Sequence, residues 1–304
     1  MAVVVGVDAG GTASKAVVLD EDGTVLGRGA GGPGNPAASG PPAARAVGSA
    51  LRSALSGVDP GAVAAGVVGV AGVSALADPA IARAFADEWA ALGLRCPMPV
   101  VGDAVTAFAA GGDWAAGAVL ICGTGAVAAL VDGLETTRVA DGLGWLLGDE
   151  GSGLWLGLQA VRRAVRRWDT PLARRVARHS GAADPDELVH WAQALPPFGA
   201  LAPDVCELAD AGDPDAEAIV AEAATRLVAT LDELGAPHAP VVLGGGLLVA
   251  ATPVRRAVLA RLHERGVPVG TAADPALGAA RLAGTYGTDL RSGSGSRAPA
   301  GRRR

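Results

Sequence analysis

Several residue types that usually carry chemistry are scarce in this chain of 304 residues. It has one tyrosine, three cysteines, four histidines and a single lysine, Lys15, and aromatic residues make up 3%. Cys96, Cys122 and Cys206 lie far apart with no C-x-x-C spacing, and the histidines are equally scattered. The sequence therefore predicts neither a zinc site nor a disulfide framework. Each cysteine is expected to be a small buried residue.

Positive charge is also scarce. The formal net charge is −6 at pH 7, and the only basic cluster is the terminal stretch of residues 301–304. A nucleic-acid-binding domain usually presents a basic face, so no nucleic-acid partner is expected. The residues before this cluster are rich in serine and glycine and cannot bury a core. We therefore predict a disordered tail over residues 288–304.

No apolar run is both long and uninterrupted. Residues 114–131 approach the roughly 20 residues that a membrane-spanning helix needs, but turn-forming residues at 122–125 interrupt them. Two short buried strands joined by a tight turn fit this stretch better. The first apolar run follows no basic region and is cut short by Asp8, unlike a signal peptide. We expect a soluble cytoplasmic protein without a membrane partner.

The residues that are present favour a globular chain with a duplicated pattern. Hydrophobic residues make up 50%, which suffices for two domains with well-packed cores. Strands are predicted at residues 2–7, 14–20 and 25–30, with a glycine-rich turn after the first. The order strand, glycine-rich turn, strand, turn returns at residues 118–133. Two halves that each begin with such a hairpin indicate a nucleotide clamped between two domains.

Helices and further strands are expected between and after these hairpins, which makes the fold class α/β. The strands are expected at residues 65–73, 98–103 (ending at Asp103) and 240–246. The helices are expected at residues 43–55, 79–92, 185–195 and 215–234, with two more starting at 153 and 275.

The first glycine-rich turn, DAGGT at residues 8–12, has the composition of a phosphate-binding turn. A Rossmann or P-loop site needs a helix directly after its glycines, and here a strand follows, so both are excluded. Gly10 and Gly11 let backbone N–H groups approach a phosphate, and Thr12 adds a hydroxyl. Asp8 is a candidate for holding waters around Mg²⁺, and Lys15 lies within reach of a phosphate. An ordinary hairpin turn with a solvated lysine is the alternative.

Two later glycine clusters are candidates for the rest of a nucleotide site. The cluster Gly123, Thr124 and Gly125 offers a second set of N–H donors to phosphate. The cluster Gly244, Gly245 and Gly246 ends a strand, where flat backbone suits an adenine ring. Each cluster alone is equally compatible with an ordinary turn.

Taken in order, these motifs resemble the actin-like ATPase superfamily of sugar kinases, actin and heat-shock chaperones. The stretch GLGWLLGDEGSGLWLGLQAV at residues 142–161 looks more specifically like the BadF/BadG/BcrA/BcrD ATPase family, in particular its N-acetylglucosamine and glucosamine kinases. The resemblance implies an actin-like (ribonuclease H-like) fold of two duplicated domains, residues 1–112 and 113–274, around an interdomain cleft. It also implies that a helix at residues 275–287 packs back on the first domain.

The resemblance also implies roles for individual residues, with ATP and Mg²⁺ as cofactors. Asp103 matches the catalytic base, a carboxylate that takes the proton of the attacking sugar hydroxyl; from the sequence alone it is also a candidate helix N-cap. For Asp149 and Glu150 the alternative is favourable charge at a helix N-terminus. The residues that match the sugar site are Asn35, Ser74, Asp103, Gly144, Trp145, Asp149 and Glu150. A homodimer is compatible with the family, although nothing in the sequence marks an interface.

The choice of sugar depends on one departure from the family pattern. Small residues at 36–38 follow Asn35, where N-acetylglucosamine kinases carry bulky ones. The chain also has few aromatic residues to pack an acetyl methyl group, whereas Asp149 and Glu150 suit a cationic amine. We therefore expect ATP-dependent phosphorylation of the 6-hydroxyl of glucosamine, with N-acetylglucosamine as the alternative.

Two other functions compete with a sugar kinase. The first is an ATPase that activates a radical dehydratase or reductase through an iron–sulfur cluster bridging a dimer, which needs two thiolates from each subunit. Cys122 lies near the expected position of one, but Cys96 and Cys206 fall in unrelated contexts. The second is a nucleotide-binding regulator without catalysis, which the presence of Asp103 and both phosphate turns argues against.

Overall fold

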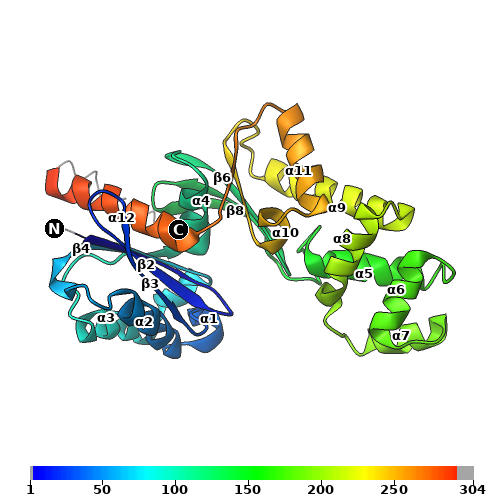
Figure 1. Ribbon diagram of the computed structural model, residues 1–304, viewed down its shortest axis with the longest axis horizontal. Coiled ribbons are helices and arrows are strands. Elements are labelled where there is room, and N and C mark those ends of the chain that lie inside the picture. Colours follow the sequence, from blue (N-terminus) through cyan, green and yellow to red (C-terminus); the bar gives the residue numbers. More distant parts are fainter. Residues whose placement is uncertain (1–2, 293–304) are drawn as a thin grey trace, which may run out of the picture. The chain divides into compact units, whose positions relative to one another are not determined.

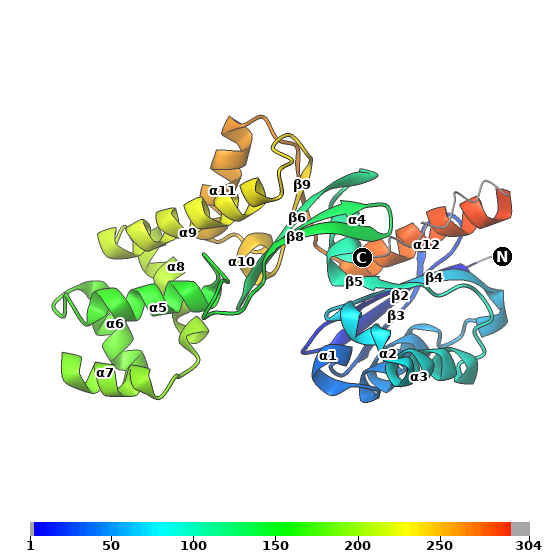
Figure 2. The same ribbon diagram turned by 180° about the vertical axis from the view of Figure 1, so that it is seen from behind.

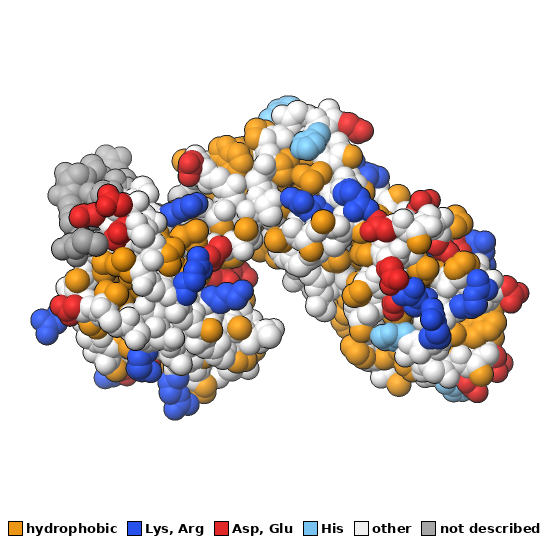
Figure 3. Space-filling view, viewed as in Figure 1, with side chains coloured by type: hydrophobic (Ala, Val, Ile, Leu, Met, Phe, Trp, Pro, Cys, Tyr) orange, Lys and Arg blue, Asp and Glu red, His pale blue; other side chains and the backbone are white. Residues whose placement is uncertain are grey.

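The structure is a computed structural model that describes residues 3–292 of the chain. The chain divides into two compact units (Figure 1). Unit 1 comprises the residues up to Ala110 and those from Asp274 onward, and unit 2 comprises Gly111–Ala273. Each unit is built on one five-stranded sheet. Figure 3 shows basic and acidic side chains interspersed on the visible face of each unit.

The sheet of unit 1 has the strand order β3-β2-β1-β4-β5. Its strands are β1 (Val3–Ala9), β2 (Ser14–Leu19), β3 (Val25–Gly31), β4 (Val63–Val70) and β5 (Val100–Gly102). Strand β1 pairs antiparallel with β2 and parallel with β4, and β4 pairs parallel with β5. The central strand β1 is almost entirely apolar because both faces of the sheet are covered.

Helices cover the two faces of this sheet (Figures 1 and 2). Side chains of α2 and α3 pack with Val5 and Val7 of β1 in one core, whereas α12 packs with Val17 and Leu19 of β2 on the opposite face. The α-helices are α1 (Pro36–Ser39), α2 (Pro42–Ala54), α3 (Pro79–Ala91), α4 (Asp103–Gly111) and α12 (Pro275–Ser292). Two 3-10 turns join them, η1 (Pro60–Ala62) and η2 (Val73–Ala77).

Unit 2 repeats the topology of unit 1 in its sheet, whose order is β10-β9-β6-β7-β8. Its strands are β6 (Ala116–Cys122), β7 (Ala126–Asp132), β8 (Glu135–Asp141), β9 (Val241–Gly244) and β10 (Val269–Thr271). As with β1, the central strand β6 pairs antiparallel with the strand that follows it and parallel with β9. The predicted duplication is therefore present at the level of strand order.

The helices of unit 2 pack with its sheet in one hydrophobic core. They are α5 (Gly153–Ala164), α6 (Pro171–Ser180), α7 (Pro185–Gln193), α8 (Ala202–Asp210), α9 (Pro214–Glu233), α10 (Gly246–Val249) and α11 (Pro253–Glu264), with the 3-10 turn η3 (Phe198–Leu201). Helices α6, α7, α9 and α11 start alike: a threonine or aspartate side chain caps the first turn and proline follows. Both residues are favoured at those positions, so these starts are encoded locally.

The predicted strands and helices are confirmed in outline, with some corrections. Strand β5 ends at Gly102 and Asp103 begins α4, close to the alternative of a helix-start residue; its carboxylate accepts the N–H of Ala104 at 3.0 Å. Helix α12 continues to Ser292, so the predicted tail began too early at residue 288. Residues 293–304 lie outside the described residues. The helices and strands that were not predicted are α1, α4, α6, α8, α10, α11, β8 and β10.

The apolar stretch at residues 114–131 forms the β6–β7 hairpin, as predicted from its turn-forming residues. Among residues 3–292, no helix has both the length and the apolar character needed to cross a bilayer.

Helix α12 lies unusually close to the sheet of unit 1. A Cβ atom added at Gly6 would overlap the backbone of Ala276 and Ala280, and one at Gly278 would lie 2.6 Å from the backbone of Thr106 and Ala110 in α4. The helix therefore fits between β1 and α4 only because glycine stands at both contacts.

We expect Gly6→Ala to lower the free energy of unfolding by about 3 kcal/mol, because backbone atoms must move to admit the methyl group. The measurement is the urea midpoint of the purified protein. Gly32→Ala is the matched control, since the nearest atom to its added Cβ is the Cβ of Ala46 at 4.0 Å. Equal midpoints for the two variants would contradict this close packing.

Candidate active site

In unit 1, parallel strand pairing gathers three predicted site segments at one edge of the sheet. Ala9 of β1 lies opposite Val70 of β4, and Val70 lies opposite Gly102 of β5. Because parallel strands end at the same edge, Asp8, the segment that follows β4 and Asp103 come together there. The order of the strands, which the sequence pattern did not give, is what brings these residues together.

The first glycine-rich turn offers fewer phosphate donors than the sequence suggested. The N–H of Gly10 donates to the carbonyl of Ala13 at 3.0 Å, so it is engaged within the turn. Gly11 and Thr12 are exposed, and within the described part of the chain their N–H groups have no protein acceptor. Lys15 lies opposite Asp8 in the β1–β2 pair and is also exposed. Two backbone donors and one ammonium group therefore remain for an anion.

Asp8 and Asp103 are two carboxylates in a poorly solvated position. Burial raises the pKa of Asp8 to about 6, and the neighbouring Asp103 contributes in the same direction, while Lys15 lowers it. Burial also raises the pKa of Asp103, against the N–H of Ala104 that donates to it. A cation beside Asp8 would relieve this cost, since it favours the ionised form.

The ligands at this edge fit Mg²⁺ better than a metal held by protein side chains alone. Among the described residues, no three side chains of histidine, cysteine, aspartate or glutamate gather at one point. Mg²⁺ is usually bound through one or two carboxylates, with waters and substrate phosphates completing its shell. Asp8 is the carboxylate best placed for this, beside the turn with free N–H groups.

Asn35 stabilises the start of a helix, in addition to its predicted contact with sugar. Its Oδ1 accepts the N–H groups of Ala37 at 2.8 Å and Ala38 at 3.3 Å, so Asn35 caps the short helix α1. Gly72, at the start of η2, lies close to the same oxygen, and Ser74 is exposed two residues later. The structure thus brings Asn35 beside the segment of Ser74. Its side-chain N–H₂ is the group left to donate to a ligand.

In unit 2 the two later glycine clusters meet at the corresponding edge. Ile121 of β6 lies opposite Gly244 of β9 in a parallel pair. Gly245 has a φ of 78°, and a Cβ there would overlap the backbone of Cys122. Glycine is therefore required for the two strand ends to approach this closely.

The second turn resembles the first in its hydrogen bonds. The N–H of Gly123 donates to the carbonyl of Gly125 at 2.9 Å, so Gly123 is not available to a phosphate. The N–H of Leu154 in α5 donates to the carbonyl of Thr124 at 3.1 Å and fixes the turn on the helix. Over residues 3–292, the N–H groups of Thr124 and Gly125 donate to no protein acceptor. These two remain for an anion.

A cavity of about 510 Å³ lies beside these glycines. Gly123, Thr124 and Gly246 line it, as a nucleotide site predicts. The sequence analysis missed the other lining residues: Gly153, Gly199, Ala202, Pro203, Cys206, Leu247 and Thr252. Most of these are apolar or small, which suits a flat ring. Nothing in the local pattern of η3 and α8 marked them as ligand-binding residues.

The block GDEGS is held by a carboxylate that the sequence analysis missed. Asp141, at the end of β8, accepts the N–H groups of Asp149 at 2.6 Å and Glu150 at 2.9 Å. Asp149 in turn accepts the N–H of Ala126 at 3.0 Å, directly after the second glycine turn. Ser152 caps α5, and Asp149 and Glu150 lie just before this cap.

Glu150 is engaged by a second residue that the sequence analysis missed, Arg226 of α9. The guanidinium of Arg226 donates to Glu150 at 2.5 Å and to Glu222 at 2.8 Å, and it lies 5.2 Å from the ring centre of Trp155. Glu150 is therefore an ion-paired carboxylate.

A small polar cavity of about 150 Å³ lies under this block. Trp145, Asp149 and Glu150 all line it, together with Ser152 and Arg162. Gly144 is not among the lining residues; its carbonyl accepts the N–H of Gly148 at 2.7 Å and closes the loop. The structure thus gathers three of the predicted sugar-site residues of unit 2 around one hollow.

The cysteines do not suit an exposed iron–sulfur cluster. Cys122 is fully buried, and its thiol donates to the carbonyl of Gly151 at 3.7 Å. Burial raises the pKa of Cys122 to about 12 and that of Cys206 to about 11. A cluster needs thiolates, which these environments disfavour. The alternative of a dehydratase activator is therefore not supported by the residues themselves.

Comparisons with known proteins identify the family and the fold. The sequence model of the BadF/BadG/BcrA/BcrD ATPase family matches residues 5–283. The N-acetyl-D-glucosamine kinase of Dictyostelium discoideum is 26% identical over 92% of this chain and 97% of its own length. The crystal structure of a putative N-acetylglucosamine kinase from Chromobacterium violaceum is 27% identical, with a TM-score of 0.70 over 93% of this chain and 99% of that one.

A more distant structure shares the fold alone. It is a ROK family glucokinase from Streptomyces griseus in complex with glucose and AMPPNP, which is 24% identical with a TM-score of 0.57 over 92% of this chain and 99% of that one. The predicted actin-like α/β fold is confirmed.

We expect Asp8→Asn to stabilise the unliganded protein at neutral pH. The pKa of Asp8 is near 6 in the folded protein and 3.8 in the unfolded chain. Ionisation of Asp8 therefore lowers the free energy of unfolding progressively as the pH rises from 3.8 to 6, and the full loss is present above pH 6. After allowance for solvent, the gain is about 2 kcal/mol, or about 5 °C in the melting temperature.

The measurement is thermal unfolding of both proteins without ligand at pH 5 and pH 7.5, where the gain should be larger at pH 7.5. Asp22→Asn, at an exposed position, is the control and should change little at either pH. A gain that is the same at both values would show that the charge of Asp8 is not its cause.

Proposed function

The chain belongs to the BadF/BadG/BcrA/BcrD ATPase family, and from this we propose that it is a kinase transferring phosphate from ATP to the 6-hydroxyl of an amino sugar. The observation that carries the proposal is the pair of desolvated carboxylates, Asp8 and Asp103, beside a turn with free N–H groups. Asp8 suits a magnesium ion, and Asp103 suits the proton of the sugar hydroxyl. Relatives that match over nine-tenths of the chain bear the name N-acetylglucosamine kinase.

Each unit, taken by itself, offers groups that suit a nucleotide. In unit 1 the free N–H groups of Gly11 and Thr12 and the charge of Lys15 suit phosphate oxygens, and in unit 2 the free N–H groups of Thr124 and Gly125 do the same. The adenosine belongs in the cavity that Gly246 and its neighbours line. Asp8 would hold Mg²⁺ through its waters; when bound, the ion neutralises charge on the transferred phosphoryl group.

Asp103 is the proposed base for the sugar hydroxyl. As the hydroxyl oxygen bonds to the γ-phosphorus and the bond to the bridging oxygen of ADP breaks, the hydroxyl proton passes to the Asp103 carboxylate. Burial raises the pKa of Asp103, so it is a better proton acceptor than a solvated aspartate. Its position at the start of α4 fixes the carboxylate at the edge of the sheet.

The proposed acceptor is N-acetylglucosamine, with glucosamine as the alternative. The sequence favours glucosamine because small residues follow Asn35, aromatic residues are few, and Asp149 and Glu150 suit a cationic amine. Arg226 neutralises Glu150, however, and Asp149 already accepts the N–H of Ala126. An acceptor without a positive charge needs neither carboxylate for compensation, so these contacts favour the acetylated sugar. The cytoplasmic location and a homodimer stay predictions.

We expect a coupled ADP-release assay with MgATP to show turnover with N-acetylglucosamine, less with glucosamine and glucose, and little without sugar. Asp103→Asn should lower kcat by about 10²–10⁴, the usual contribution of a general base, while sugar binding by calorimetry persists. Unchanged turnover in this variant would remove Asp103 as the base. ADP release that ignores every sugar would refute the proposed function.

Arg226→Met should shift the preference towards glucosamine, because it leaves Glu150 as an unpaired carboxylate. We expect the ratio of kcat/KM for glucosamine over N-acetylglucosamine to rise about tenfold, the effect of one partly screened charge. Arg226→Lys keeps the charge and should restore much of the original ratio. Glu222→Gln is the control, since it touches Arg226 but not the sugar site. A ratio unchanged in Arg226→Met would show that Glu150 does not face the sugar.

A further inference from the structure

The carboxylate of Asp149 contacts two parts of unit 2 that serve different steps of the proposed reaction. One is the small polar cavity, which Asp149 lines. The other is the second glycine-rich turn, since Oδ1 of Asp149 accepts the N–H of Ala126 at 3.0 Å. Ala126 follows Thr124 and Gly125, whose N–H groups have no acceptor among the described residues. No group between residues 3 and 292 donates to Oδ2 of Asp149, so this second oxygen is left for a ligand.

The approach of Asp149 to the turn needs special backbone geometry. A Cβ added at Gly125 would lie 2.8 Å from Oδ1 of Asp149 and 3.0 Å from Oδ2. Asp149 itself has a φ of 57°, a conformation that residues with a side chain rarely adopt. Its N–H donates to Asp141 at 2.6 Å, which holds it there. The contact is therefore maintained against a backbone preference, as is common at functional sites.

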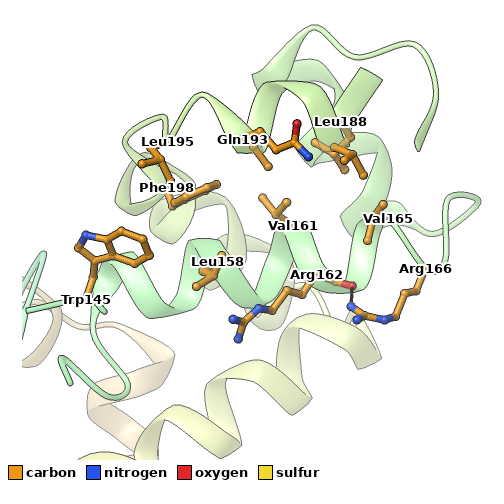
Figure 4. A pocket seen from close by; sticks show the side chains of 12 residues that line it. Trp145, Leu158, Val161, Arg162, Val165, Arg166, Leu188, Gln193, Leu195 and Phe198 are labelled. Carbon is orange, nitrogen blue, oxygen red and sulfur yellow. Dashed lines mark hydrogen bonds between the residues drawn. The ribbon is translucent and has the colours of Figure 1, made fainter. Parts of the chain in front are cut away.

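The start of α5 connects the same two regions. Gly153 lines the larger cavity and the next residue, Leu154, lines the polar one. Both donate their N–H groups to carbonyls of the second turn, at 2.8 and 3.1 Å. Trp145 and Leu158, which also line the polar cavity, lie at this end of the helix (Figure 4). A sugar in the polar cavity would therefore lie against the helix start that holds the second turn.

Unit 1, taken by itself, shows a similar relation through backbone groups. The N–H of Gly34, next to Asn35, donates to the carbonyl of Gly10 at 2.9 Å. The N–H of Ala71 donates to the carbonyl of Ala9, also at 2.9 Å. Both donors belong to segments that carry predicted sugar contacts, and both acceptors lie at the first glycine-rich turn. Because backbone groups make these bonds, a side-chain substitution cannot remove them, whereas it can remove the bond of Asp149.

We propose that Asp149 is a positioning residue for the nucleotide: it fixes the second glycine-rich turn through Ala126, and a sugar in the polar cavity strengthens this hold. The inference rests on the proposed function and adds a role for Asp149 beyond contact with sugar. A sugar hydroxyl that donates to Oδ2 restricts the carboxylate, so the turn loses less conformational freedom when a nucleotide binds. The sugar therefore tightens nucleotide binding, and by linkage the nucleotide tightens sugar binding by the same factor.

The test measures the Kd of MgAMPPNP by calorimetry on the full chain, without and with saturating N-acetylglucosamine, and takes the ratio of the two values. We expect a ratio of about 10–100 in the parent protein. Asp149→Gly removes the acceptor and tolerates the positive φ, so it should lower the ratio about tenfold, the effect of one lost hydrogen bond. Asp149→Asn keeps an acceptor oxygen and tolerates the same φ, so it should retain most of the ratio.

Gly125→Ala is a second variant, because its methyl group would displace the carboxylate from a position outside the lining of the polar cavity. It should lower the ratio as Asp149→Gly does, while sugar binding alone persists. The matched control is Gly123→Ala in the same turn, whose added Cβ would lie 3.9 Å from its nearest neighbour, the backbone N of Gly246. Its ratio should equal that of the parent protein, since a change in nucleotide affinity alone cancels in the ratio.

If N-acetylglucosamine is phosphorylated but the parent ratio is one, or both Asp149→Gly and Gly125→Ala keep the parent ratio, the positioning role is refuted and the proposed function stands. A ratio that falls equally in Asp149→Asn and Asp149→Gly would overturn the inference as well, since the charge of Asp149, and not its bond to the turn, would then be responsible. If no sugar is phosphorylated, the proposed function itself fails.

Discussion

The site depends above all on the parallel pairing of strands within each sheet. Parallel pairs end at the same edge, so β1, β4 and β5 deliver Asp8, the segment of Ser74 and Asp103 to one place, and β6 and β9 do the same for their glycines. This arrangement carries an electrostatic cost, because Asp8 and Asp103 are drawn together where water is scarce. A magnesium ion and a sugar hydroxyl are ligands that would offset that cost.

Much of this arrangement was predictable because its signals are local. Apolar runs broken by glycine marked the hairpins, whereas the cap-and-proline pairs that start α6 and α11 are local signals that were not used. The short elements α1 and β10 were missed because four or three residues carry no periodicity. Arg226 could not be found either, since it lies 76 positions from Glu150. The family resemblance, not the composition, supplied the roles of Asn35 and Asp103.

From the sequence, residues of the same type within one motif were given the same role. In the structure they have different hydrogen-bond partners. Adjacent carboxylates in the GDEGS block take different partners: Asp149 accepts a backbone N–H at the glycine turn, and Glu150 binds Arg226. In each of the two glycine-rich turns, the first glycine donates its N–H within the turn, while the N–H groups of the next two residues have no acceptor among the described residues. Hydrogen bonding therefore determines which members of a motif are available to a ligand, and residue type alone does not.

The close contact between α12 and β1 has a consequence for the order of events during synthesis. Unit 2 is a continuous stretch, Gly111–Ala273, whereas unit 1 needs α12, which is synthesised after all of unit 2. Until Ala276 and Ala280 of α12 are synthesised, the face of β1 that they pack against is uncovered. The second half of the duplication is therefore fully synthesised before the first, and until then the face of the unit 1 sheet that α12 covers has no helix on it, as in the partly folded species that aggregate most readily.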